Sequence, residues 1–370
     1  FSIGYSFSDY PWNYHQAQAR MGIPEFQRYT QSWKYLILLT IAKIILNQDQ
    51  SLPHDEASVE DMVRLESFVV DSYDTRNPEI TQLFAPSRTL KLQPGFQLDR
   101  KLLEAGVSPE ELPIEHLPVI VGDVNRNLCD LVLKVLNPAH RYFVAFDELD
   151  LGFVPDDPDY SSRLIGLFLA ARDLNKAARA ANKQLFVVIC LRDDIYEQLH
   201  FEDKNKITDN YFSRIEWDSE QTARTLKSLM EKRFEVILSK RLEAKWDDLF
   251  DENQPPPKGY ASKYEYMLAR TFLRPRDMIK YCNIVLNRFK SRLRARRGGQ
   301  RLQFQNEDLE ASEAEYSRYL YREIDDEIHK HLPDYKQHFD VFRRLGNYRF
   351  EYDAFCEEYA KSPVNDESPL

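Results

Sequence analysis

The sequence has neither a cysteine pattern nor an apolar run that could cross a membrane. Its four cysteines lie far apart, without the CxxC or Cys/His spacing of a zinc site or of a disulfide framework: Cys129, Cys190, Cys282 and Cys356. The longest apolar run, residues 35–46, is interrupted by Thr40 and Lys43 and is too short for a bilayer. We therefore expect a protein of the reducing cytoplasm with no membrane partner.

A glycine followed by lysine is also missing. Eleven glycines are present, and none of them precedes a lysine. The loop that cradles nucleotide phosphates requires GxxxxGK and then Ser or Thr, because its backbone N–H groups and its lysine meet the β and γ phosphates. The sequence begins with Phe1 instead of methionine and has no leader, so we expect it to begin inside a longer polypeptide.

Composition and charge are those of a soluble globular protein. Hydrophobic residues make up 43% and charged residues 30%, and 370 residues suffice for two or three domains. The formal net charge of −10 argues against nucleic-acid binding by the whole surface, although it leaves room for a local basic patch.

The chain is organised around residues 141–150, an apolar stretch that ends in carboxylates. Five consecutive apolar or aromatic residues predict a strand buried on both faces, and Asp147 and Glu148 follow directly. In open α/β sheets, ligands bind outside the carboxyl ends of the strands. We therefore expect Asp147 to hold Mg²⁺ through water and Glu148 to polarise an attacking water. The alternative is an acidic turn, which is common after strands.

A second apolar strand, residues 185–191, follows a helix predicted over 160–182 and ends next to Arg192. A strand, a helix and a strand with a crossover of this length predict a right-handed βαβ unit whose parallel strands end at one edge. Arg192 then lies on the same rim as Asp147 and Glu148. The predicted fold class is α/β, with a parallel sheet covered on both faces.

The remaining elements predict an α/β core over residues 1–254 and a helical lid over 255–370. In the core we expect a strand over 1–10, a helix over 24–46, a helical insertion at about 48–117 with pieces near 58–71 and 98–105, a helix over 123–136 capped by Asp123, a short strand at 215–217, and a helix to about 242 opened by a capping box of Asp218 and Gln221.

Three prolines at 255–257 mark the boundary between the two regions. In the lid we expect helices over 264–272, 275–294 and 307–332. Residues 333–359 predict a helix, a turn at Gly346-Asn347, a strand over 348–352 and a last helix, which is the order of a winged helix.

Together these motifs resemble those of P-loop ATPases. The strand that ends in Asp147 and Glu148 looks like a Walker B element, and the strand that ends in Arg192 looks like the one that carries sensor 1. Residues 273–279, Leu-Arg-Pro-Arg-Asp-Met-Ile, are similar to the sensor 2 stretch of AAA+, STAND and KAP-type ATPases. The resemblance covers most of residues 1–295 and points to bacterial ATPases found among phage-defence and other conflict genes.

The resemblance implies a P-loop NTPase-like core that binds ATP and Mg²⁺ between core and lid. Such a protein would be an ATP-hydrolysing switch or motor that acts as a homo-oligomer or on an effector protein. Arg274 and Arg276 would contact phosphate, although solvation or a carboxylate partner also accounts for them. Arg192 would pair with Asp193 or Asp150, or act as an arginine finger across a subunit boundary.

The sequence departs from this family in its missing phosphate loop. Either the loop lies upstream of Phe1, or the protein is a degenerate ATPase that serves as a nucleotide-free scaffold. We favour the first, because a retained pair of acids without a metal would be an unexplained energetic cost.

A basic run at 288–301 contains seven arginines and lysines and no acid. Its candidate contacts to nucleic-acid phosphates or to an acidic partner are Arg292, Arg294, Arg296 and Arg297. A solvated helix end is the commoner explanation, since basic residues suit a helix C-terminus and Gly298 can end the helix.

Overall fold

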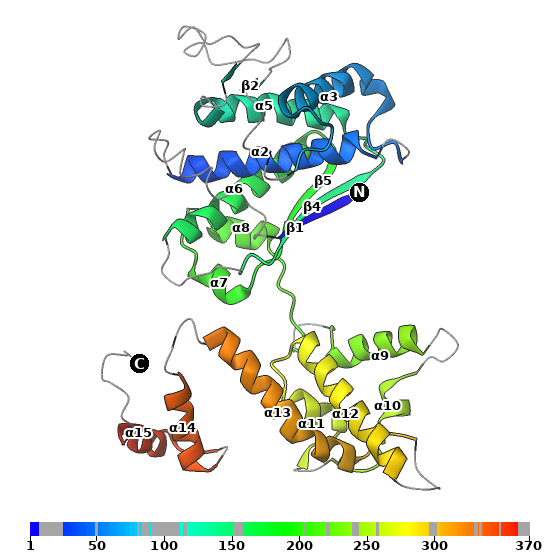
Figure 1. The fold of residues 1–370 in the computed structure, drawn as a ribbon, viewed down its shortest axis with the longest axis vertical. Coiled ribbons are helices and arrows are strands. Elements are labelled where there is room, and N and C mark those ends of the chain that lie inside the picture. The colour runs from blue at the N-terminus through cyan, green and yellow to red at the C-terminus, as the bar shows by residue number, and fades with distance from the viewer. Residues whose placement is uncertain are drawn as a thin grey trace. The chain divides into compact units, whose positions relative to one another are not determined.

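In the computed structural model the chain forms two compact units, Phe1–Ser213 and Arg214–Leu370, whose elements are labelled in Figure 1. The structure describes residues 1–6, 25–48, 51–79, 82, 89–90, 112–113, 117–150, 158–202, 204–219, 223–238, 244–256, 259–295, 302–328, 332, 335–347 and 349–361. The division falls earlier than the boundary predicted after residue 254. The reason is that Leu226, Met230 and Trp246 share a core with the later helices.

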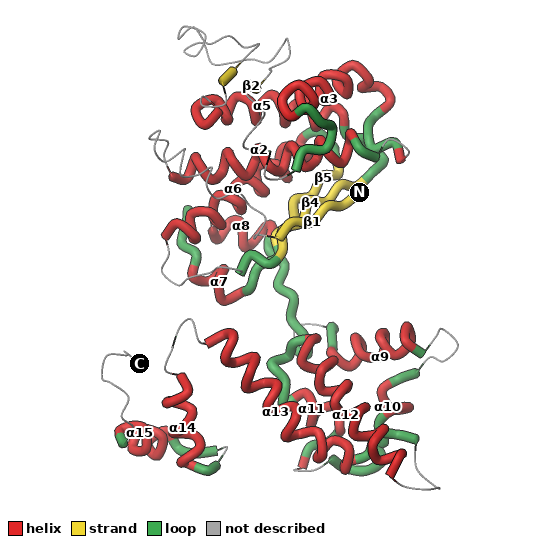
Figure 2. Tube along the Cα trace, in the orientation of Figure 1, coloured by secondary structure: helices red, strands yellow, loops and turns green. Residues whose placement is uncertain are grey.

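The first unit contains a three-stranded parallel sheet in the order β1 (Ser2–Ser6), β4 (Arg141–Asp147) and β5 (Gln184–Ile189), drawn yellow in Figure 2. α6 (Pro158–Ala180) connects β4 to β5, which confirms the predicted strand, helix and parallel strand. The molecule is mostly helical, and this small parallel sheet is compatible with the α/β class.

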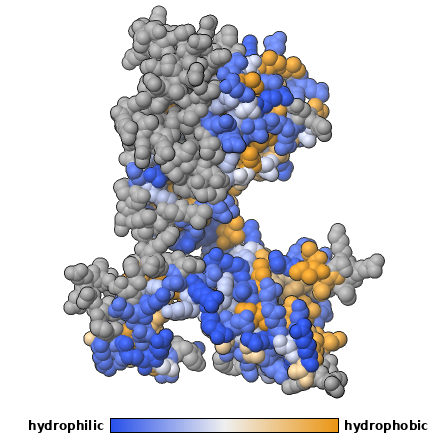
Figure 3. Space-filling view, in the orientation of Figure 1, coloured by the Kyte–Doolittle hydropathy of each residue, from blue (hydrophilic) through white to orange (hydrophobic). Residues whose placement is uncertain are grey.

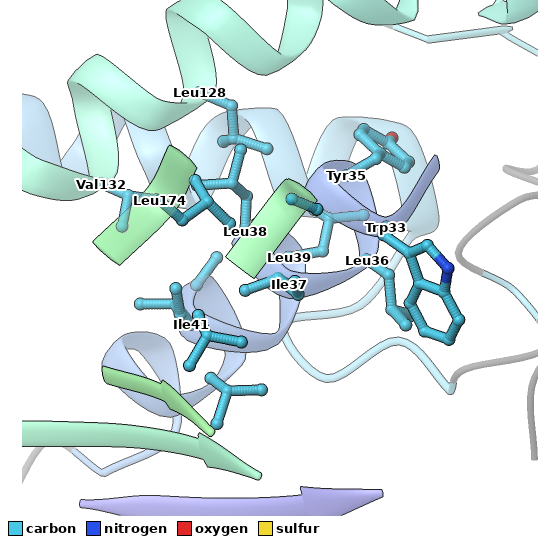
Figure 4. Packing of buried hydrophobic residues seen from close by; sticks show 14 of the residues in the cluster. Trp33, Tyr35, Leu36, Ile37, Leu38, Leu39, Ile41, Leu128, Val132 and Leu174 are labelled. Atoms are coloured by element: carbon cyan, nitrogen blue, oxygen red, sulfur yellow. The ribbon is translucent and has the colours of Figure 1, made fainter. Parts of the chain in front are cut away.

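One face of the sheet is covered by helices. α2 (Glu25–Leu46) and α6 pack against the strands, α5 (Leu117–Val135) packs on α2, and α3 (Val59–Tyr73) packs on α5. α2 is apolar around most of its circumference, and every residue from Tyr35 to Leu39 is at most 1% exposed. Figure 4 shows this packing around α2. A helix that is hydrophobic on all sides belongs in a core, as the sequence predicted for this segment.

The close contact between α2 and α6 depends on Gly166. A Cβ atom at this position would lie 2.4 Å from Cβ of Tyr29, so a larger residue would push the two helices apart. Nearby, the indole nitrogen of Trp33 donates a hydrogen bond of 2.9 Å to the carbonyl of Arg163. The polar atom of this buried ring is thereby satisfied within the same helix pair.

The other face of the sheet is exposed, which corrects the prediction that both faces are covered. Burial alternates along β4 and β5, and Phe143, Phe186 and Val188 keep between 37% and 41% of their surface exposed. The rings of Phe143 and Phe186 stack on neighbouring strands, with centroids 5.2 Å apart. The apolar runs are therefore strands with one buried and one exposed face.

The first unit also contains several short elements. They are η3 (Glu56–Ser58), β2 (Thr89–Leu90), which pairs antiparallel with β3 (Leu112–Pro113), α7 (Asp193–Gln198) and α8 (Lys204–Tyr211). α3 confirms the helix predicted near 58–71, whereas the piece predicted near 98–105 lies outside the described residues. Asp123 lies inside α5 and does not begin it.

The second unit is helical throughout its described part. Its helices are α9 (Leu226–Ile237), α10 (Trp246–Leu249), α11 (Lys263–Leu268), α12 (Pro275–Ala295), α13 (Asn306–Ile328), α14 (Tyr335–Leu345) and α15 (Tyr352–Ala360). α12 and α13 pack against each other, and the stacked rings of Tyr281 and Tyr316 lie between them, 4.1 Å apart.

Two predictions for this unit are wrong. Residues 215–217 form no strand. The predicted capping box would begin a helix at Asp218, but α9 begins at Leu226. The hydroxyl of Thr225 caps α9 by accepting from the N–H of Ser228 at 3.0 Å. Gln221 lies outside the described residues.

The end of the chain departs from the predicted winged helix. α14 and α15 confirm its two helices, but residues 349–351 between them are not a strand, and Tyr348 lies outside the described residues. Among the helices described, none combines the length and hydropathy needed to cross a membrane.

Candidate functional site

The carboxyl ends of the three parallel strands form one rim, as predicted from the sequence. The strand register places Ser6 of β1 beside Asp147 of β4. The N–H of Cys190, the first residue after β5, donates to the carbonyl of Phe146 at 2.8 Å. Asp147, Glu148 and Cys190 therefore lie at the same edge of the sheet, and Arg192 follows two residues later.

The two acids that end β4 are both exposed, and the backbone at Glu148 is left-handed. Its φ is 55°, a conformation that costs a residue with a side chain about 1 to 2 kcal/mol. The N–H of Glu148 donates to Oδ1 of Asp147 at 2.8 Å, and this bond fixes the turn. Strained backbone of this kind is concentrated at functional sites, so the geometry motivates a functional hypothesis.

A buried anchor holds this turn in place. Leu149 is 1% exposed and packs in the core, and its carbonyl accepts a hydrogen bond from the hydroxyl of Tyr160 at the start of α6. Burial raises the pKa of Tyr160, and the charge of Asp150 raises it further, so the hydroxyl keeps its proton and its role as donor. The buried Leu149 and its hydrogen bond from Tyr160 therefore hold the backbone next to the two acids.

The pKa of the Cys190 thiol is raised by its surroundings at the rim. Its partial burial raises the pKa of the thiol, and the negative charge of Asp147 raises it further. The thiol is therefore more fully protonated at neutral pH than an ordinary cysteine. Sequence analysis assigned no role to Cys190, because its proximity to Asp147 depends on the parallel register of β4 and β5.

Arg192 is held by a carboxylate on its own helix. Its Nε and one terminal nitrogen form a fork to Asp194, with distances of 3.1 and 2.8 Å. Burial acts to raise the pKa of Asp194, but the hydrogen bond and charge of Arg192 outweigh it and lower the pKa. Asp194 is a partner that the sequence analysis did not name. Arg192 lies at the predicted rim. There it forms an ion pair within its own chain, whereas an arginine finger would reach across a subunit boundary.

A Mg²⁺ ion fits this rim only in part. Among the described residues, no three His, Cys, Asp or Glu side chains converge on a metal position. Mg²⁺ keeps several waters and commonly uses one or two carboxylates together with substrate phosphates. The exposed carboxylate of Asp147 suits that mode.

The two arginines of the sensor 2-like stretch have carboxylate partners within the second unit. Arg274 Nε lies 3.0 Å from Oδ2 of Asp277, which is completely buried at the first turn of α12. Arg276 lies 3.4 Å from Glu323 of α13 and is 59% exposed. Both arginines therefore have the carboxylate partner that the sequence analysis gave as the alternative to a phosphate contact. Their contact with phosphate stays a prediction.

Two arginines of the basic run, Arg288 and Arg292, pair with acids of α13. Arg292 is 9% exposed and forms a fork to the buried Asp308, with distances of 2.9 and 2.8 Å. This buried pair speaks against Arg292 as a contact to nucleic acid. Arg294 is exposed, whereas Arg296 and Arg297 lie outside the described residues.

One comparison with known proteins gives a match. A family model described as a FunZ-associated C-terminal helical domain matches residues 224–325. The match begins just before α9 and ends within α13, so the chain is similar to this domain over most of the second unit's helices. No curated protein and no solved structure matches the chain.

Proposed function

We propose that this chain belongs to an ATP-binding and ATP-hydrolysing switch or motor subunit with a P-loop NTPase-like core. The observation that carries the proposal is the exposed Asp147 and Glu148 pair, which ends the central strand of a parallel sheet in a strained turn. Ligands of open α/β sheets bind at this edge. An anti-phage setting is part of the proposal on the resemblance alone.

In this proposal each acid has its own role. Asp147 would hold Mg²⁺ through its exposed carboxylate, and the ion would supply positive charge against the phosphates. Glu148 would accept a proton from a water and orient that water. The buried Leu149 and its hydrogen bond from Tyr160 hold the backbone of this turn, and a positioned base requires such a support.

The proposal requires a phosphate loop from outside these 370 residues, since no glycine precedes a lysine. Two features of the sheet support an additional strand and helix. β5 is an edge strand of the described sheet, and the face with Phe143, Phe186 and Val188 is exposed. Parallel sheets are normally buried on both faces, so a further layer would complete this one.

The test is to replace Glu148 by Gln in the polypeptide that includes the phosphate loop. Glutamine keeps the shape of the side chain but cannot act as a base, so ATP should bind as in wild type while phosphate release falls by about 10²- to 10⁴-fold. The matched control is Glu202→Gln, an exposed acid of the same unit that is not on the rim. Unchanged phosphate release in Glu148→Gln would reject the proposed base.

A second candidate function is a nucleotide-free scaffold that assembles with copies of itself or with an effector protein. The ion pairs of Arg274 and Arg276 favour it, because each of these arginines has a carboxylate partner in its own unit, Asp277 or Glu323. Binding of a fluorescent ATP analogue by the full polypeptide separates the two functions. The scaffold predicts no binding at any Mg²⁺ concentration.

A further inference from the structure

An apolar groove with a basic rim lies along α9 in the second unit. Its apolar lining residues include Trp217, Leu229, Val236 and Ile237, and its volume is about 820 Å³. Figure 3 shows a hydrophobic area at the place where Figure 1 labels α9. The volume lies within the range of about 300 to 1,000 Å³ that is typical of ligand sites.

The outer face of α9 is more apolar than that of an ordinary surface helix. Leu226 and Met230, one turn apart, face the core and are buried, which explains how α9 is anchored. On the outer face, Val236 and Ile237 are 75% and 69% exposed, and they lie side by side at the end of the helix. Single exposed apolar residues are normal, but a group that lines a hollow marks an interaction site.

The charged residues of the groove all carry the same sign. Arg224, Lys232 and Arg233 line it, and none of its lining residues is acidic. Lys232 is partly neutralised by Glu235 of the same helix at 3.3 Å. Positive charge around apolar lining residues is complementary to a ligand that is apolar on one side and acidic on the other. The whole chain has a net charge of −10, so this basic rim is a local feature.

We propose that this groove binds an acidic amphipathic helix of a partner protein. A helix of that kind would place apolar side chains spaced by three and four residues on Leu229, Val236 and Ile237. Its carboxylates would then face Arg233. The inference is independent of ATP binding and goes beyond the proposed function, because it involves only the second unit.

The groove is less suited to nucleic acid than to a peptide. Nucleic-acid affinity comes mainly from many phosphate contacts, and single strands also need aromatic platforms on which successive bases stack. This groove offers three cations and one tryptophan, Trp217, beside aliphatic side chains. These aliphatic side chains contribute to binding through burial of apolar surface, which a peptide helix supplies and a phosphate backbone does not.

The test uses two synthetic helical peptides with the same leucine face, one with glutamate and the other with lysine on its polar face. Binding to the purified chain is measured by the fluorescence anisotropy of the labelled peptides. A change in tryptophan emission that Trp217→Phe removes reports occupation of the groove. We expect the glutamate peptide to bind more tightly than the lysine peptide, with an affinity that falls as salt is added.

Three variants locate the binding. The double variant Val236→Asp and Ile237→Asp should weaken the glutamate peptide by about tenfold or more, because it replaces two apolar contacts with charges that repel the peptide. Arg233→Glu should weaken it and reduce its salt dependence. Leu302→Asp is the matched control, because Leu302 is 78% exposed in the same unit but does not line the groove.

Four results would overturn the proposal: no binding to wild type, equal binding of the two peptides, unchanged binding in the groove variants, or displacement of the peptide by an oligonucleotide of the same charge. Self-association of the wild type that the double variant abolishes would overturn it too, because a second copy of the chain would then occupy the groove. Circular dichroism of each variant confirms that these exposed substitutions leave the fold intact.

Discussion

The two acids at the rim of the first unit and two buried acids of the second unit are in opposite situations. Asp147 and Glu148 are exposed at the end of β4, and no ion pair to either of them is found within the described residues. Asp277 and Asp308 of the second unit are at most 2% exposed, and each forms an ion pair with an arginine. A buried charge must be paired, whereas an exposed one remains available to a ligand.

This difference separates charges that hold the fold from charges that can act. The arginines that the sequence marks in the second unit, Arg274 and Arg292, are partners of buried acids and belong to the packing of α12. Asp147 and Glu148 are exposed instead, and the backbone at Glu148 is left-handed. The rim of the sheet is therefore a place where carboxylates remain available to a ligand.

The largest expected effect is on the buried pair of Arg292 and Asp308. Arg292→Met keeps much of the side-chain volume but leaves Asp308 buried without its partner, which should destabilise the second unit by about 3 to 5 kcal/mol. Hydrogen exchange resolved by peptide during urea titration reports this unit separately. The control is Arg294→Met on the same helix, where an exposed side chain should change stability by at most about 0.5 kcal/mol. Equal effects of the two substitutions would show that Arg292 is not structural.

A smaller effect of opposite sign is expected at Glu148. Glu148→Gly removes the Cβ that makes the left-handed conformation costly, so the first unit should become more stable by about 1 kcal/mol. Glu148→Ala keeps the Cβ and should bring no such gain. Urea unfolding measures both variants. If glycine destabilises the unit as alanine does, the turn at Glu148 is not strained in solution.

The smallest effect concerns the Cys190 thiol. Burial and the charge of Asp147 both raise its pKa, so Asp147→Asn should lower the pKa and speed alkylation by iodoacetamide at pH 8. Mass spectrometry of the labelled peptides measures the rate for each cysteine. Cys356 is exposed in the second unit and serves as the internal control. An unchanged Cys190 rate would mean that the two side chains do not lie together at the rim.

Sequence periodicity predicted the elements whose pattern is local. The apolar runs at β4 and β5, the long apolar helix α2 and the proline that begins α12 each determine an element through neighbouring residues. The parallel pairing of β4 and β5 followed from the length of the crossover between them. These elements were enough to place Asp147, Glu148 and Arg192 on one rim.

Features that depend on tertiary packing could not be predicted in this way. Asp218 was expected to begin a helix, but its carboxylate reaches the N–H of Leu226 at 2.7 Å and the hydroxyl of Tyr264 at 2.6 Å. The pairing of Arg292 with Asp308 exists only because α12 and α13 pack together. The exposed sheet face was missed because an apolar run looks the same whether one or both faces are buried.

The most direct test of the central claim is a titration of ATP into the full-length protein that contains this chain, with and without Mg²⁺. If Asp147 holds the ion, Mg²⁺ should strengthen ATP binding in wild type, and Asp147→Asn should remove that Mg²⁺ dependence while the fold stays intact. Asp209→Asn, an exposed acid on α8, should behave like wild type. ATP binding that depends on Mg²⁺ equally in wild type and in Asp147→Asn would contradict the assignment of the rim.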